Sequence, residues 1–378
     1  MIIDMGVSLI NRVVEEVRSL PIRCALAAIS GGVDSTTAAV LVRRAIGDRL
    51  RAVFIDTGFM RINEPGSVRE MLKAVLPIEV IDASGRFYRE MLGLGDAEEK
   101  RIKFREVFYT VLSEIARGYG CDWLVQGTIA PDWIETRGGI KTQHNVLEQI
   151  GIDTVLKYGF RLLEPLRELY KDQVRELAKQ LGVPDAIINR QPFPGPGLSI
   201  RAVGELTLEK LDVVRRATKI VEERLNGMGL SQWFAAAWEY EVSPSEDLAR
   251  AVSGLGRLGA YLFRIRATGV KGDSRAYGHV VLISGEPGNW GSIYELYRYL
   301  GAMPSVTHVV YELVSRGVGR YFVSIRAVLT EDFMTADVAR LPRDVLMDIA
   351  REIMNSDDRV AAVGYDVTPK PPATIEYE

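Results

Sequence analysis

The sequence predicts an α/β domain built on a parallel sheet, followed by a smaller α+β domain. In the first half, short apolar segments alternate with amphipathic helical segments, the pattern of strand–helix–strand units with right-handed crossovers. A segment rich in proline and glycine, residues 191–198, interrupts this alternation, and the order of helices and strands changes beyond it. The length of 378 residues suits two or three domains, each able to bury its own core.

The composition indicates an ordinary globular protein, with 47% hydrophobic and 26% charged residues. The net charge of −3 gives no electrostatic reason to expect binding to nucleic acid or to a membrane surface. No apolar run approaches the roughly 20 residues that cross a bilayer, and the first residues lack the basic segment of a signal peptide. Two cysteines in so long a chain suit a reducing compartment. We therefore expect a cytoplasmic protein in which Cys24 and Cys121 are packing residues.

The first predicted elements surround a glycine-rich loop. An amphipathic helix over residues 4–20 ends before Pro21, and an apolar strand over 24–29 follows it. The loop occupies residues 30–35, and a helix over 36–46 then ends at Gly47. The small polar residues of the loop therefore lie where a buried strand turns into a helix.

This loop, with the sequence SGGVDS, is expected to bind the phosphates of a nucleotide. Glycines let the backbone approach a ligand closely, and amides at the start of a helix attract anions. Asp34 beside a phosphate would be repulsive unless a cation lay between them, and Mg²⁺ is the natural choice. The pattern differs from the Walker loop, which requires a Gly-Lys-Ser/Thr ending. The alternative is a glycine-rich turn in a fold without a nucleotide, but strand, loop and helix together favour nucleotide binding.

Further strands and helices alternate along the first domain. We expect strands over residues 51–56, 78–82, 122–128 and 160–165, and helices over 64–76, 104–116 and 170–181. Ligands of parallel sheets collect at the carboxyl ends of the strands, where the loop at Ser30 and the turn at Asp56 both fall. A charged run at residues 96–101 is interpreted as a solvated helix start. His144 follows a glycine-containing turn, and a lone histidine is more often structural than catalytic.

The domain boundary is predicted near Ala202. Residues 191–198 form either a stiff linker or a rigid wall against a planar ligand, because their prolines exclude a helix or a central strand. The expected domains are residues 1–202 and 203–378. The second has helices over 208–225 and 341–354 and strands over 261–267, 279–283, 322–328 and 360–367, in a small antiparallel sheet. The tail, residues 370–378, is either a loose end or a stiff segment that docks.

The loop resembles the pyrophosphate loop of the N-type ATP pyrophosphatases, and longer motifs resemble the synthetase portion of the GMP synthase family. The matching motifs run through both domains: SGGVDS at 30–35, DAEEKR at 96–101, QGT at 126–128 with Pro131 and Asp132, IK with His144 and Asn145, EPLREL with Lys171 and Asp172, PFPGPGL at 192–198, EDFMTAD at 331–337 and the KPPATIE tail. The loop alone marks the superfamily, whereas the proline–glycine segment and the tail are close to specific for the family.

The resemblance implies roles for individual residues. The loop would hold the β,γ-pyrophosphate of ATP through Ser30, Gly31, Gly32, Val33, Asp34 and Ser35. Asp34 would bind Mg²⁺, and Lys171 would reach the pyrophosphate, so these two are the catalytic candidates. XMP would contact Arg61, Arg201, Lys370 and Glu376. Arg61 and Lys370 suit its 5′-phosphate, and Glu376 would accept hydrogen bonds from the ring.

The resemblance also implies a reaction and partners. The enzyme would be a ligase that aminates XMP to GMP through an adenylylated intermediate and releases AMP and pyrophosphate. The second domain would form a homodimer. Bacterial and eukaryotic relatives usually begin with an amidotransferase domain bearing a catalytic cysteine, whereas this sequence opens with the pyrophosphatase domain and neither of its cysteines lies in a nucleophile turn. We therefore expect a separate glutaminase subunit, as in the two-subunit archaeal type.

Parts of the sequence depart from the family pattern. Residues 284–320 read as an insertion and residues 231–260 match weakly; both stretches could decorate a dimer surface or touch a partner. The segment TGFMR at 57–61 replaces the commoner NGLLR. NAD synthetase and a nucleotide-binding regulator without turnover are the alternative functions. The first would leave the KPP tail unexplained, and the second is opposed by the presence of Asp34, Lys171 and Glu376.

Overall fold

The computed structural model describes residues 2–131, 154–271, 274–331 and 333–378. The chain divides into two compact units. The first unit contains Met1–Glu90 and Lys103–Phe193, and the second contains Met91–Ile102 and Pro194–Glu378. The domain boundary near Ala202 stays a prediction.

The first unit is built on a five-stranded sheet, as the sequence predicts. Its order is β3-β2-β1-β4-β5, and every neighbouring pair is parallel. The strands are β1 (Ala25–Ala28), β2 (Leu50–Asp56), β3 (Glu79–Asp82), β4 (Trp123–Val125) and β5 (Arg161–Leu163). The central position of β1 puts the loop that follows it between the carboxyl ends of β2 and β4.

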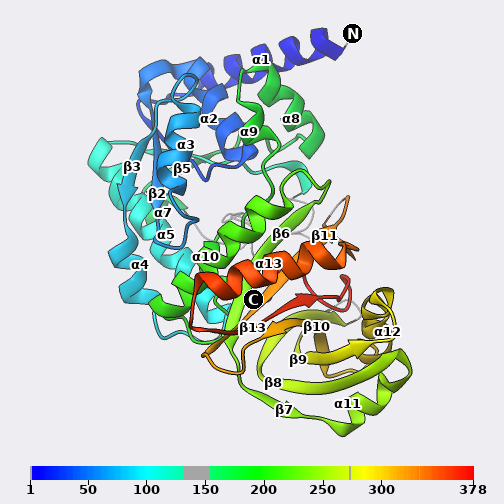
Figure 1. Ribbon diagram of the computed structural model, residues 1–378. Helices are drawn as coiled ribbons and strands as arrows, with labels where there is room; N and C mark the ends of the chain where they lie inside the picture. The colour runs from blue at the N-terminus through cyan, green and yellow to red at the C-terminus, as the bar shows by residue number, and fades with distance from the viewer. Residues whose placement is uncertain (1, 132–153, 272–273, 332) are drawn as a thin grey trace. The chain divides into compact units, whose positions relative to one another are not determined.

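Helices cover this sheet and bury a core rich in valine, leucine and isoleucine. They are α1 (Ile2–Ser19), α2 (Val33–Ile46), α3 (Glu64–Leu72), α4 (Ser84–Met91), α5 (Ala97–Tyr119), α7 (Thr154–Tyr158), α8 (Lys171–Gln180) and α9 (Asp185–Ile188). The amphipathic α1 packs against α2 and α8 (Figure 1). The helix α4 was not expected from the sequence.

The two cysteines form a disulfide, so the prediction that they are simple packing residues is wrong. Cys24 directly precedes β1, and Cys121 lies just before β4, the neighbouring parallel strand. The bond closes a loop with a sequence separation of 97 residues and joins the amino ends of two strands. The same two strands lead at their carboxyl ends into the loop at Ser30 and the turn at Gly127.

The second unit contains an eight-stranded mixed sheet, whereas a small antiparallel sheet was predicted. Its order is β12-β11-β13-β10-β9-β8-β7, and β6 pairs with β11. The pairs β9–β10 and β11–β13 are parallel, and the remaining pairs are antiparallel. The strands are β6 (Gln232–Glu239), β7 (Val242–Pro244), β8 (Gly256–Lys271), β9 (Ser274–Pro287), β10 (Val306–Ser315), β11 (Tyr321–Leu329), β12 (Asp337–Val338) and β13 (Val360–Asp366).

The two stretches that depart from the family pattern form structural elements of this sheet. Residues 231–260 contain β6, β7 and the start of β8, and residues 284–320 contain β10. The side chains of β10 are buried from Val306 to Tyr311, and β10 lies between β9 and β13. Both stretches therefore supply strands to the core rather than surface decoration alone.

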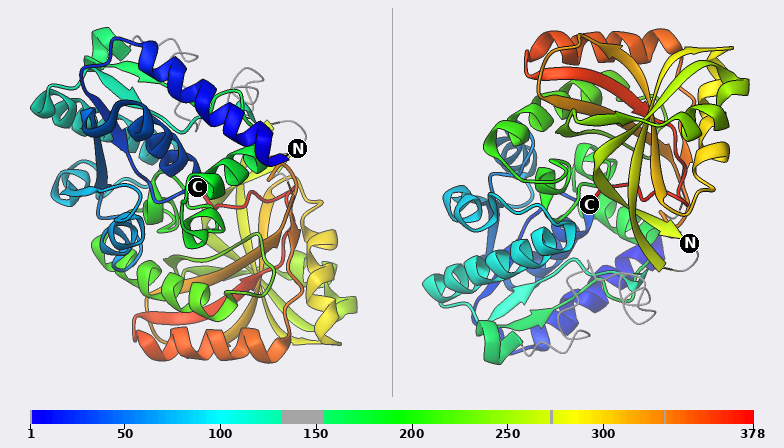
Figure 2. Two further views of the ribbon diagram at one scale, coloured as in Figure 1. Left: turned by 90° about the horizontal axis from the view of Figure 1, so that it is seen from above. Right: turned by 90° about the horizontal axis from the view of Figure 1, so that it is seen from below.

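Helices also pack on the second sheet. They are α10 (Leu208–Leu225), α11 (Glu246–Ala251), α12 (Leu296–Leu300) and α13 (Arg343–Ser356). Figure 2 shows α13, in orange, along the sheet, and α13 contacts α10, β10 and β13. Among the residues that the structure describes, no helix is long and apolar enough to span a bilayer.

Candidate active site

The glycine-rich loop connects β1 to α2 and is held by its own hydroxyl groups. The Oγ atoms of Ser30 and Ser35 lie 2.9 Å apart, and the Ser30 amide donates to Ser35 Oγ at 3.2 Å. The Thr36 hydroxyl donates to the Gly32 carbonyl at 2.8 Å. Gly32 is the N-cap of α2 and has no side chain to satisfy the first amides of the helix. These amides are therefore left for an anion.

At two positions of the site only glycine fits, because atoms of neighbouring residues would collide with a Cβ atom there. Gly31 has φ of +80°, and a Cβ there would lie 2.6 Å from Arg190 Nη1 and 2.8 Å from Val68 Cγ2. A Cβ on Gly127 would lie 2.6 Å from both Asp34 C and Ser35 N. The turn after β4 thus packs directly on the backbone of the loop, which fixes the position of the first turn of α2.

An ion pair joins the first turns of two helices at this edge of the sheet. Lys171, the first residue of α8, places its Nζ 2.6 Å from Asp34 Oδ2 in α2. A cation at a helix amino end opposes the helix dipole, whereas an anion there is favoured. Lys171 therefore adds positive charge where two helix amino ends already attract anions. The structure brings together the two residues that the sequence singles out as catalytic.

The donor set at Asp34 fits a magnesium ion. Asp34 Oδ1 is buried and has no hydrogen-bond partner among the described residues. Protein Mg²⁺ sites commonly use one or two carboxylates and complete their coordination with substrate phosphates and water. In the described ranges, no group of three or more histidine, cysteine, aspartate or glutamate residues could hold a metal by itself. A metal at Asp34 would therefore depend on phosphate oxygens of a bound nucleotide.

A buried carboxylate is linked to the loop through an arginine side chain. Glu64, at the start of α3, accepts from Arg190 Nη2 at 2.7 Å and pairs with Arg61 Nη1 at 3.3 Å. Arg190 Nη1 also donates to the Gly31 carbonyl at 3.3 Å, and the Arg61 guanidinium lies 4.1 Å from the centroid of the Phe193 ring. Glu64 and Arg190 were missed in the sequence, because no local pattern shows that residues so far apart meet. Arg61, an expected XMP ligand, belongs to this cluster in the first unit.

The second unit contains the other three expected XMP ligands. Arg201 donates through Nε and Nη2 to the two carboxylate oxygens of Glu376, at 3.0 and 2.8 Å. Gln232, which sequence reasoning missed, donates to Glu376 Oε1 at 2.8 Å. Arg201 is fully buried and its guanidinium lies 3.9 Å from the centroid of the Phe234 ring. The structure thus brings Arg201 and Glu376 into direct contact.

Lys370 contacts a different part of the second unit. Its backbone pairs with Ala336, and its Nζ donates to the Phe333 carbonyl at 2.5 Å. These contacts place Lys370 beside the segment that precedes β12. The expected motif residues Asp132, His144 and Asn145 lie outside the described residues.

The charged run at residues 96–101 is partly buried, so its interpretation as a fully solvated helix start is wrong. Lys100 is fully buried and its Nζ lies 2.5 Å from Glu378 Oε2. Glu378 Oε1 accepts from the Gly204 amide at 2.7 Å. Burial raises the pKa of Glu378, although the charge and hydrogen bond of Lys100 oppose this shift.

Arg101 is a second cation in the same run. Its Nε and Nη1 atoms are buried and have no hydrogen-bond partner within the described part of the chain. Burial lowers the pKa of Arg101 to about 10, and the positive charge of Arg275 acts in the same direction. The charges of Glu376 and Glu378 partly offset this effect. Arg101 thus carries a charge close to the tail, with two of its donor atoms unsatisfied by any described residue.

Two segments of the chain match models of known protein families. Residues 302–377 match the family model described as GMP synthase C terminal domain, and residues 141–224 match the NAD synthase model. Among solved structures, the NMN synthetase from Francisella tularensis has a TM-score of 0.38 and 18% identity, over 57% of this chain and 93% of that one.

Whole-chain relatives are much more similar, and each is named as one subunit of a glutamine-hydrolyzing GMP synthase. The relative from Sulfurisphaera tokodaii is 49% identical over 94% of both chains. The relative from Saccharolobus solfataricus is 50% identical over 93% of this chain and 94% of its own. The one from Thermococcus kodakarensis is 42% identical over 94% and 93%. With identities of this size along nearly the entire sequence, the chain belongs to the family of this GMP synthase subunit.

Proposed function

We propose that this chain is the synthetase subunit of a GMP synthase and converts XMP to GMP at the expense of ATP. In the first step the xanthine C2 oxygen attacks the α-phosphorus of ATP and pyrophosphate leaves. In the second step ammonia attacks C2, the C–O bond to the adenylyl group breaks, and AMP leaves. No protein nucleophile is needed. The observation that carries the proposal is the Lys171–Asp34 pair, which joins two helix amino ends beside the glycine-rich loop.

The loop and its surroundings suit the departure of pyrophosphate. Negative charge grows on the leaving group, and fixed cations and backbone amides stabilise it without reorganisation. The amides of Gly31 to Ser35 would bind the β- and γ-phosphates, and Lys171 would turn from Asp34 to a phosphate oxygen. The released Asp34 carboxylate would hold Mg²⁺, which neutralises phosphate charge when it is bound.

The proposed XMP ligands have matching chemistry. Arg61 and Lys370 are cations suited to a phosphate monoester. Glu376 is held by Arg201 and Gln232 through three hydrogen bonds. A carboxylate accepts about four, so one position is left for a purine N–H donor. Arg201 would act on the nucleotide through Glu376 and through its own charge.

The proposal includes partners. Ammonia would come from a separate glutaminase subunit, the second domain would form a homodimer, and the enzyme would work in the cytoplasm. The curated relatives are named as one subunit of glutamine-hydrolyzing enzymes, which supports a second, different subunit.

An amination assay tests the function. The purified chain is given ATP, Mg²⁺, ammonium and XMP, and release of pyrophosphate, AMP and GMP is measured. We expect the three products in equal amounts and only when XMP is present. IMP controls for the purine, and deamido-NAD controls for the NAD synthase likeness of residues 141–224. Turnover of deamido-NAD without turnover of XMP would reject the proposal, and binding without any turnover would favour a regulator.

A further inference from the structure

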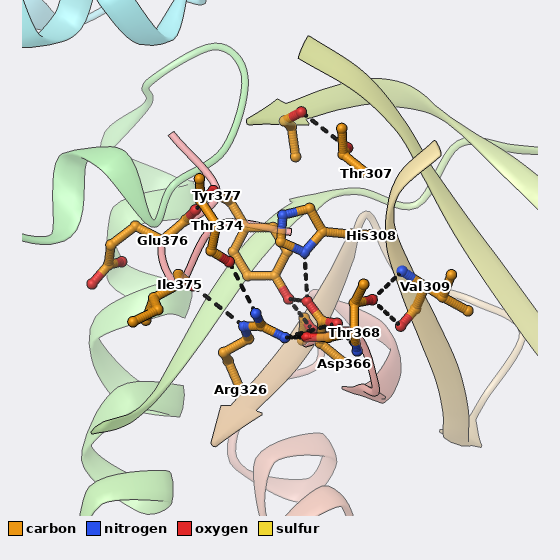
Figure 3. Close-up of polar contacts among 12 residues, drawn as sticks. Thr307, His308, Val309, Arg326, Asp366, Thr368, Thr374, Ile375, Glu376 and Tyr377 are labelled. Carbon is orange, nitrogen blue, oxygen red and sulfur yellow. Dashed lines mark hydrogen bonds and ion pairs between the residues drawn. The ribbon is translucent and has the colours of Figure 1, made fainter. Parts of the chain in front are cut away.

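A buried polar network holds residues 367–378, which include the C-terminal tail 370–378, against the second sheet (Figure 3). The tail lies along β8: the amides of Thr268 and Val270 donate to the carbonyls of Tyr377 and Pro372, at 2.8 and 2.7 Å. The segment is therefore docked, and the alternative of a loose end is excluded. Its docking matters because the tail carries two of the proposed XMP ligands, Lys370 and Glu376.

Arg326, in β11, is the centre of this network. The side chain is fully buried and donates to the backbone carbonyls of Thr368 at 2.6 Å, Thr374 at 2.9 Å and Ile375 at 3.3 Å. Thr368 lies before Lys370, whereas Thr374 and Ile375 lie directly before Glu376. One planar guanidinium thus joins the two ends of the loop that contains Lys370 (Figure 3).

Asp366, the last residue of β13, holds Arg326 in place. Its Oδ1 lies 3.0 Å from Arg326 Nη1, and its Oδ2 accepts from His308 and from the Tyr377 hydroxyl, both at 2.7 Å. Burial opposes the charge on Asp366, but the charges of Arg326 and His308 and these hydrogen bonds outweigh burial and lower its pKa. An ionised Asp366 is therefore the shared acceptor of the network.

His308 and Tyr377 complete the arrangement. His308 Nε2 lies 3.0 Å from the Thr268 carbonyl, which is an acceptor only. Both ring nitrogens of His308 thus lie within hydrogen-bond distance of acceptor oxygens. The ring of Tyr377 lies 4.5 Å from that of His308, and its hydroxyl is also 2.8 Å from Ser324 Oγ. The Arg326 guanidinium, the His308 ring, the Asp366 carboxylate and four backbone carbonyls thus contact one another in a single buried network.

We propose that Arg326 and Tyr377 are positioning residues for XMP. Both act through the tail. Arg326 joins the two ends of the loop that contains Lys370 and so sets the distance between Lys370 and Glu376. Tyr377 directly follows Glu376 in the chain, and its hydrogen bond to Asp366 holds this part of the tail in place. Neither side chain needs to touch the nucleotide, because both are fully buried. This inference rests on the proposed function, since it takes Lys370 and Glu376 to be nucleotide ligands.

The test uses Tyr377→Phe, which keeps the ring and removes only the hydroxyl. We expect the KM for XMP to rise about tenfold, the size of effect that follows when a bond to a charged group is lost. The KM for ATP and kcat should stay within about twofold, because the ATP loop belongs to the first unit. Amide hydrogen exchange of residues 367–378 should become faster, which reports the release of the tail.

Tyr365→Phe is the matched control. Tyr365 is equally buried in β13, but its hydroxyl donates to the Ala339 carbonyl at 2.6 Å and has no bond to the tail. This variant should lose stability without raising the KM for XMP. Arg326→Lys keeps the charge but loses the planar fork, and it should raise the KM for XMP further. If Arg326→Lys fails to fold, the KM for XMP of Tyr377→Phe still tests the positioning role.

The outcomes separate this inference from the proposed function. An unchanged KM for XMP in Tyr377→Phe, or an equal rise in Tyr365→Phe, would overturn the inference while leaving the amination activity intact. If the wild-type chain shows no XMP-dependent release of pyrophosphate, the proposed function fails and the positioning role falls with it. Faster exchange of the tail together with a selective rise in the KM for XMP supports the inference.

Discussion

Asp34 and Lys171 are separated by 137 positions in the sequence, yet they meet at the first turns of α2 and α8. Their ion pair is partly exposed, with 29% and 40% of the side chains accessible. Such pairs contribute at most about 1 kcal/mol to stability. The pair therefore contributes little to folding, which is compatible with the proposed binding of a metal and a phosphate.

Replacing Asp34 by alanine should abolish adenylation and leave the fold intact. We expect XMP-dependent pyrophosphate release to fall by about 100-fold or more, the effect of removing one group that stabilises developing charge. The melting temperature should change little, because the pair is partly exposed and contributes little to stability. The control is Glu70→Ala, which breaks the exposed Lys73–Glu70 pair of α3 and should leave the rate unchanged. Retained turnover in Asp34→Ala would remove this residue from the metal role.

The neighbours Lys100 and Arg101 should respond to substitution in opposite ways. Lys100→Met leaves the buried Glu378 without its partner and should destabilise the second unit by about 3–5 kcal/mol. Arg101→Met removes a cation whose pKa is lowered by burial, so it should be neutral or stabilising. Denaturant unfolding of both variants measures the difference. A large loss of stability in Arg101→Met would mean that its charge is well compensated in the folded protein.

Among the elements, the parallel strands of the first unit could be predicted and several strands of the second could not. Strands β1 to β5 are short apolar runs between helices, and their local pattern suffices. The strand β10 falls in the stretch that reads as an insertion in the sequence, although its segment from Val306 to Tyr311 is rich in β-branched residues and is buried. Its parallel pairing with β9 and the parallel pairing of β11 with β13 depend on residues distant in sequence.

The candidate active site could also be predicted only in part from the sequence. The sequence identifies Asp34 and Lys171 through motifs, but it does not identify Glu64, Arg190 or Gln232, whose only distinction is the partner that each meets. The burial of Lys100 could not be predicted either, since its partner Glu378 is 278 positions away. The disulfide escaped prediction because nothing local shows that Cys24 and Cys121 begin neighbouring strands.

The docked tail should make the second unit sensitive to acid. The pKa of Asp366 lies below its value of about 3.9 in an unfolded chain. Its contribution to stability is therefore present above that pH and is lost as the pH falls toward the pKa of the folded state. Asp366→Asn should be less stable at pH 7, with a shallower loss of unfolding free energy below about pH 4. The pKa of Glu378 is raised, so its contribution to stability depends on pH in the opposite direction, but this residue is present in both the wild-type protein and the Asp366→Asn variant. Equal slopes in the two proteins would exclude Asp366 as the source.

At the scale of the whole molecule, the two units carry different parts of the proposed reaction. The first unit holds the loop and the Lys171–Asp34 pair, and the second unit holds Arg201, Lys370 and Glu376. Arg61, the remaining proposed XMP ligand, lies in the first unit, and the GMP synthase C terminal domain model matches residues 302–377 of the second. In the proposed reaction the chain would supply groups for ATP and XMP, and ammonia would come from a separate glutaminase subunit.

The purified chain should therefore use ammonium and fail to use glutamine. We expect GMP with ATP, XMP and ammonium, and none when glutamine replaces ammonium, because neither cysteine is free to act as a nucleophile. Chromatography coupled to mass spectrometry measures GMP in both reactions. Release of glutamate from glutamine by this chain alone would contradict a separate glutaminase subunit.

The close packing of Gly127 on the loop has a consequence for evolution. Every missense change in a glycine codon adds at least a Cβ atom, and here that atom would collide with backbone atoms that cannot rotate away. A substitution at this codon would push the turn after β4 off the amino end of α2 and distort the anion site. Position 127 should thus tolerate no replacement in a saturation library selected for purine prototrophy, even where neighbouring surface codons drift freely.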